Sequence, residues 1–188
     1  MTQEKHEIRP GQSVELLKEL HILTRDGRMN QDSRRKLKQV YHLYQFIEPL
    51  LTEAAQDHPE ICLVDHGAGK SYLGFILYDL FFKPRQGGGR LYGVENRDEL
   101  VAQSRQLAER LGFAGMSFLN LSVAEAIDSD LLPARVDVVT ALHACDTATD
   151  DAIRFALHRQ ARHIVLAPCC QAEVAAVLRK HKARALAA

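Results

Sequence analysis

The spacing of hydrophobic positions divides the chain into two parts. In the first part, apolar side chains recur every three or four residues, which is typical of amphipathic helices. Ser13 can cap a first helix, Asp26-Gly27 interrupts it, and a second helix begins at Asp32-Ser33. The apolar stripe of the second helix consists of Leu37, Val40, Tyr41, Tyr44, Ile47 and Leu51. We therefore expect residues 1–58 to form an N-terminal helical extension.

From Ile61 onward, short apolar runs alternate with amphipathic helices. Strands are predicted at residues 61–64, 91–94, 116–121, 136–142 and 163–167. Helices are predicted at residues 71–82, 98–111, directly after Ser122, and at 147–160 and 171–183. This order predicts an α/β fold: a Rossmann-like doubly wound parallel sheet, covered by helices on both faces, over residues 59–188.

Right-handed crossovers bring the loops that follow parallel strands to one edge of the sheet, where ligands bind. Candidate chemistry is therefore expected in the loops at residues 65–70, 95–97, 120–122, 142–147 and 168–171. The extension should lie away from that edge.

Composition narrows the classes of protein that fit. The 188 residues are 46% apolar and 26% charged, and 24 basic residues balance 24 acidic ones, which argues against a globally basic nucleic-acid binder. No apolar run approaches the ~20 residues of a membrane span. Cys169 and Cys170 are adjacent, which is unlike a disulfide framework, so we expect a reducing, cytoplasmic location. Collagen, coiled coil, membrane protein and disulfide mini-protein are excluded.

The segment from Val64 to Ser71 reads Val-Asp-His-Gly-Ala-Gly-Lys-Ser and has three interpretations. A dinucleotide fingerprint fits Gly67 and Gly69 but finds Tyr72 in place of its third glycine. A phosphate-binding P-loop fits the end of the segment but lacks its first glycine, and Asp65 would repel phosphates. The third is the D-x-G-x-G loop of a methyltransferase, where Asp65 would attract the positive charges of S-adenosylmethionine. A glycine-rich turn with no ligand also remains open.

The end of the second predicted strand favours the third interpretation. Glu95 stands where a ribose would lie, and a carboxylate there accepts hydrogen bonds from both ribose hydroxyls. Asn120 can bond the adenine edge, or it simply ends its strand. The predicted cofactor-binding residues are Asp65, Gly67, Gly69, Lys70, Glu95, Asn96, Asn120, Leu121 and Leu142.

The loops after the fourth and fifth strands bring several reactive side chains together, namely His143, Cys145, Asp146, Cys169 and Cys170. The H-x-C and C-C spacings differ from those of structural zinc sites, so we predict no metal here. Reactive thiols are a second alternative. We favour His143 and Asp146 as catalytic residues on the substrate side, with the cysteines packed as small apolar residues.

Residues 25–38 form a basic segment, with six basic and two acidic side chains. Arg28, Arg34, Arg35 and Lys38 are candidate phosphate contacts for RNA. A solvated helix face is the alternative explanation.

These motifs together resemble the class I S-adenosylmethionine-dependent methyltransferases. A Leu142-His143-Ala144-Cys145 segment and a Pro168-Cys169-Cys170 segment are more narrowly similar to one group. That group holds methyltransferase-like proteins, the glutathione-S-transferase C-terminal-domain-containing protein and tRNA 2′-O-ribose methyltransferases of the acceptor stem. The resemblance implies S-adenosylmethionine as cofactor and RNA, specifically tRNA, as the favoured acceptor over protein. The fold of that class has seven strands and only five are readable here, so we expect either a truncated core or a longer natural protein that holds the last two.

Two hypotheses follow. In the first, the chain transfers a methyl group by in-line displacement, with His143 or Asp146 as general base. In the second, it is a non-catalytic cofactor-binding or scaffold module with the same fold.

Overall fold

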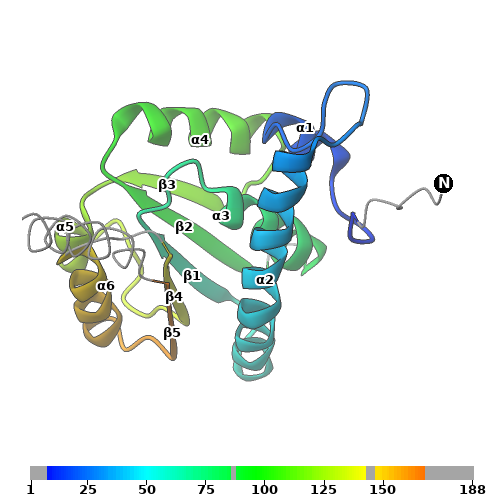
Figure 1. Cartoon of the computed structure of the whole chain (residues 1–188). Helices are drawn as coiled ribbons and strands as arrows, with labels where there is room; N and C mark the ends of the chain where they lie inside the picture. The colour runs from blue at the N-terminus through cyan, green and yellow to red at the C-terminus, as the bar shows by residue number, and fades with distance from the viewer. Residues whose placement is uncertain (1–7, 86–87, 143–146, 168–188) are drawn as a thin grey trace, which may run out of the picture.

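The computed structural model describes residues 8–85, 88–142 and 147–167. Within them, five parallel strands form one sheet in the order β3-β2-β1-β4-β5 (Figure 1). The strands are β1 (Ile61–His66), β2 (Gly89–Glu95), β3 (Met116–Asn120), β4 (Val138–Ala141) and β5 (His163–Leu166). The helices are α1 (Val14–Glu19), α2 (Gln31–Asp57), α3 (Tyr72–Leu77), α4 (Asp98–Arg110), α5 (Val123–Ile127) and α6 (Thr147–His158). The predicted α/β sheet with an N-terminal helical extension is confirmed.

The sheet is covered by helices on both faces (Figure 1). One buried cluster joins the sheet to α1, α2, α3 and α4, and includes Leu16, Leu51 and Phe75. A second cluster joins the other face to α5 and α6 and is centred on Val64 and Phe155. Because both faces are buried, the central strands are almost continuously apolar, as the sequence pattern indicated.

Among the boundaries that differ from the sequence prediction, three have a reason that the structure shows. The second helix begins at Gln31, because Asn30 caps it by accepting a hydrogen bond from Ser33 N at 2.8 Å. Strand β1 continues through two polar residues to His66, since both neighbouring strands pair with it. The helix predicted at 71–82 is α3 followed by a π-helical turn, η1 (Tyr78–Phe82), and a 3₁₀ turn, η2 (Lys83–Arg85). Apolar periodicity does not distinguish these hydrogen-bonding patterns. The helix predicted at 171–183 lies outside the described residues.

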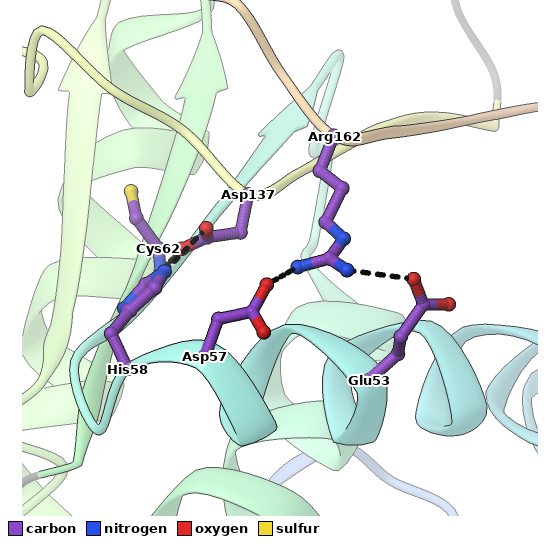
Figure 2. Close-up of polar contacts among 6 residues, drawn as sticks. All are labelled: Glu53, Asp57, His58, Cys62, Asp137 and Arg162. Atoms are coloured by element: carbon purple, nitrogen blue, oxygen red, sulfur yellow. Dashed lines mark hydrogen bonds and ion pairs between the residues drawn. The ribbon is translucent and has the colours of Figure 1, made fainter.

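Buried Asp137, just before β4, ties the end of α2 to the sheet (Figure 2). One of its oxygens lies 2.8 Å from Nε2 of His58, the residue that ends α2, and the other accepts a hydrogen bond from Cys62 N in β1 at 2.8 Å. One carboxylate thus joins the extension, the central strand and the approach to β4.

A second link lies beside it on the last turns of α2 (Figure 2). The Arg162 guanidinium, just before β5, is paired with Glu53 at 3.0 Å and with Asp57. Together with the burial of Ile47 and Leu51, these contacts make the C-terminal half of α2 part of the same packed structure as the sheet.

Candidate functional site

A cavity of about 840 Å³ opens at the carboxyl edge of the sheet, above β1 and β2. The loop between β1 and α3, the end of β2, the loop between β3 and α5, the start of α6 and one face of α2 line it. This is the edge where strand order reverses between β1 and β4, which is the usual ligand position in open α/β sheets. The volume is within the range of pockets for small molecules.

Asp65 places a carboxylate at the base of this cavity. Thr140 is its register partner on β4, so both side chains lie on the same face, and the Thr140 hydroxyl donates to Asp65 Oδ1 at 2.6 Å. Burial raises the pKa of Asp65 to about 6, although the Thr140 hydrogen bond acts in the opposite direction. The carboxylate is therefore mostly ionised at pH 7 and attracts a cationic ligand.

The glycine-rich loop follows directly. Gly67 and Gly69 have φ of 66° and 57°, a backbone conformation that favours glycine. Ser71 shares this left-handed conformation at φ 51°, and its buried Oγ has no hydrogen-bond partner. The two glycines thus let the backbone of the loop line the cavity.

Glu95 ends β2 beside this loop. Its Oε2 accepts a hydrogen bond from Gly69 N at 2.8 Å, and Arg97 donates to both of its oxygens. Burial alone would raise the pKa of Glu95, but the hydrogen bonds from Arg97 and Gly69 outweigh it and hold that pKa below its ordinary value. A second ionised carboxylate therefore faces the cavity.

The middle of β2 has to be small for this arrangement to form. A Cβ on Gly93 would lie 2.6 Å from the Phe118 ring and 3.3 Å from the Ala68 side chain. The glycine at this position lets the loop after β1 approach the neighbouring strand closely.

Most of the predicted cofactor-binding residues meet at the cavity. Those that line it are Asp65, Gly67, Gly69, Lys70, Glu95, Asn96, Leu121 and Leu142. Asn120 is not among the lining residues, since its side-chain amide donates instead to Asp98. The predicted catalytic residues His143 and Asp146, and Cys145, Cys169 and Cys170, lie outside the described residues.

Several lining residues were missed by the sequence analysis. Lys36 and Gln39 of α2 reach the cavity, although that helix was expected to lie away from this edge. Its packing across α3 decides this, and a linear pattern carries no signal for it. Arg97 could have been predicted, because it lies only two residues after Glu95 in the sequence. Thr140 does not line the cavity but donates to Asp65, and this role can be recognised only once the strand register is known.

No three His, Cys, Asp or Glu side chains in residues 8–85, 88–142 and 147–167 are grouped so that they could hold a metal ion. Among the helices of these same ranges, none is long and apolar enough to cross a membrane.

The charge of the side chains that line the cavity distinguishes between the three interpretations of the loop. A phosphate in this cavity would face the carboxylates of both Asp65 and Glu95. The sulfonium and ammonium groups of S-adenosylmethionine would instead be attracted, and its ribose hydroxyls need the acceptor that Glu95 provides. The residues fit this cofactor, and fold and site together define a class I S-adenosylmethionine-dependent methyltransferase.

Comparison with known families supports this class. A family profile described as a methyltransferase domain matches residues 35–177, and the chain belongs to that family. Its cofactor is therefore S-adenosylmethionine. No curated protein matches the chain.

Solved structures with a similar fold include an rRNA methylase from Streptococcus thermophilus, with 16% identity and a TM-score of 0.46 over 65% of this chain and 69% of the other. TrmK of M. capricolum, solved with S-adenosyl-homocysteine, is 12% identical with a TM-score of 0.42 over 62% of this chain and 49% of its own.

Proposed function

We propose that the chain methylates RNA, and that the RNA reaches the cofactor cavity along the basic segment of α2. The observation that supports this is that α2 carries both exposed basic side chains and side chains that line the cavity. Arg34, Arg35 and Lys38 are exposed on its N-terminal half, while Lys36 and Gln39 of the same turns line the cavity. A polyanion bound to the segment would therefore lie beside the methyl donor.

Two of the proposed contact residues already have acidic neighbours. Arg28 pairs with Asp26 at 2.7 Å and Arg35 with Asp32 at 3.9 Å, with all four side chains largely exposed. Exposed pairs of this kind contribute about 0–1 kcal/mol, so a phosphate can replace the acid at little cost.

The resemblance of Leu142-His143-Ala144-Cys145 and Pro168-Cys169-Cys170 to tRNA 2′-O-ribose methyltransferases supports tRNA as the acceptor. When bound, S-adenosylmethionine supplies an electrophilic methyl group. Asp65 and Glu95 would hold its methionine and ribose parts, and Lys70 would face its carboxylate. His143 or Asp146 is proposed to take the proton of the acceptor hydroxyl.

The test is transfer of a labelled methyl group from S-adenosylmethionine to total RNA and, separately, to total protein. We expect label in RNA. Label in protein alone would contradict the RNA proposal, and label in neither would favour a non-catalytic module.

A charge-reversal variant tests the route. Replacing Arg34, Arg35 and Lys38 by Glu should abolish RNA binding, whereas the dissociation constant for S-adenosyl-homocysteine should stay unchanged. If three or four side chains contact phosphates, the wild-type affinity for single-stranded RNA should fall with salt with a log–log slope of roughly −2 to −3. The matched control replaces Arg90, Arg110 and Arg135, exposed residues outside the basic segment, by Glu. RNA binding that survives the change of Arg34, Arg35 and Lys38 would place the contact surface elsewhere, and binding lost equally in both variants would show that it depends only on total charge.

A further inference from the structure

The carboxylate of Glu95 has no free acceptor position in this structure. Oε1 accepts hydrogen bonds from Arg97 N at 3.1 Å and Arg97 Nε at 2.9 Å. Oε2 accepts from Gly69 N at 2.8 Å and Arg97 Nη2 at 3.0 Å. An ionised carboxylate offers about four lone-pair positions, so these donors fill them.

The Arg97 guanidinium lies on the cavity side of this carboxylate. Arg97 itself lines the cavity, and its Nη2 is 3.7 Å from the position that a Cβ on Gly69 would take. The guanidinium therefore covers the edge of the glycine loop at the same oxygens that ribose hydroxyls would need. Two hydroxyl donors cannot bond Glu95 until this fork leaves.

We propose that Arg97 determines cofactor affinity by closing the ribose position of Glu95, and that binding requires its guanidinium to rotate away. The backbone bonds from Arg97 N and Gly69 N can remain, because they leave one position on each oxygen. Release of the Nε and Nη2 bonds frees one acceptor for each ribose hydroxyl. The proposal rests on the cofactor assignment and is independent of RNA as acceptor.

The movement is feasible because the two partners differ in burial. The Glu95 side chain is only 5% exposed, whereas that of Arg97 is 57% exposed. Glu95 would stay in place, and the guanidinium can turn into water at low cost. A binding position that is competent for only part of the time lowers the apparent affinity by that fraction.

The test is the dissociation constant for S-adenosyl-homocysteine, measured by titration calorimetry. Arg97→Ala should bind about three- to tenfold more tightly than wild type, and Arg97→Lys should be intermediate, because a lysine cannot form the two-pronged contact. The matched control is Arg110→Ala, which removes an arginine of 56% exposure paired with Glu19 on another surface. It should leave the constant unchanged.

Two further measurements separate this role from a structural one. In a Glu95→Gln background, Arg97→Ala should give no gain, because the fork is already lost. High salt should reduce the difference between the dissociation constants of wild type and Arg97→Ala, because it screens the ion pair between Arg97 and Glu95. Weaker binding by a folded Arg97→Ala protein would overturn the proposal, and so would an equal gain in the Glu95→Gln background.

Discussion

Two adjacent residues of β1, Asp65 and His66, are buried with opposite electrostatic consequences. Successive side chains of a strand point to opposite faces, so Asp65 faces Thr140 while His66 packs edge-on to Phe155. The centroids of the two rings are 4.5 Å apart. Neither ring nitrogen of His66 has a hydrogen-bond partner, and burial lowers the pKa of His66 to about 4. Burial raises that of Asp65 to about 6.

These shifts predict opposite pH dependences of stability. The raised pKa of Asp65 gives a contribution to the free energy of unfolding that is fully present below about pH 4. This contribution is lost as the pH rises to about 6. The lowered pKa of His66 gives a contribution that is present above about pH 6.5 and lost as the pH falls to about 4. Each amounts to about 3 kcal/mol at 1.36 kcal/mol per pKa unit, so in the wild type they largely cancel.

Urea unfolding at pH 4.5 and 6.5 tests this cancellation. Asp65→Asn leaves only the histidine contribution, so the free energy of unfolding should rise between the two pH values. His66→Leu leaves only the carboxylate contribution, so it should fall. The same direction of change in both variants would contradict the assignment.

At the scale of elements, α2 is held to the sheet by one buried acid and one exposed arginine (Figure 2). Asp137→Ala removes an acceptor shared by Cys62 N and His58, and should lower the free energy of unfolding by about 2–4 kcal/mol. Arg162→Ala breaks pairs with exposed Glu53 and Asp57, and should cost about 0–1 kcal/mol.

Chemical denaturation of the two variants compares these effects directly. Asp137→Asn, which keeps one acceptor oxygen, should fall between them. Equal costs for Asp137→Ala and Arg162→Ala would mean that the ion pairs hold the helix as strongly as the buried carboxylate does.

At the scale of the whole molecule, cofactor binding should stabilise the entire fold, because the cavity is built from α2, both central strands and α6. At a hundred times its dissociation constant, S-adenosyl-homocysteine adds about 2.7 kcal/mol, which raises the melting temperature by roughly 5–10 °C for a domain of this size.

Thermal denaturation with and without the ligand measures this shift. Glu95→Ala, which loses charged hydrogen bonds of about 1.5–3 kcal/mol to the ribose, should show less than half of it at the same ligand concentration. A comparable shift with a nucleoside triphosphate and magnesium would instead support the P-loop interpretation.

Local patterns predicted the elements well, because hydrophobic periodicity and capping act over a few residues. Ser13 and the Ser122–Glu125 capping box mark helix starts as expected. The alternation of strands and helices was enough to predict a parallel sheet and the edge where Asp65 and Glu95 meet. The end of β1 was misplaced, because two polar residues at the end of a strand look like a turn until both neighbouring strands are known.

The sequence by itself determined the class of fold and the acids near the ends of β1 and β2, since alternating strands and helices form a parallel sheet and the handedness of its crossovers follows from general rules. Only the tertiary structure decided that α2 forms a wall of the cavity, that Thr140 donates to Asp65, and that Arg97 donates to the carboxylate of Glu95. Helix packing and strand register join residues far apart in the chain, and side-chain rotation decides which donor an acceptor receives. Neither leaves a periodic signal in the sequence.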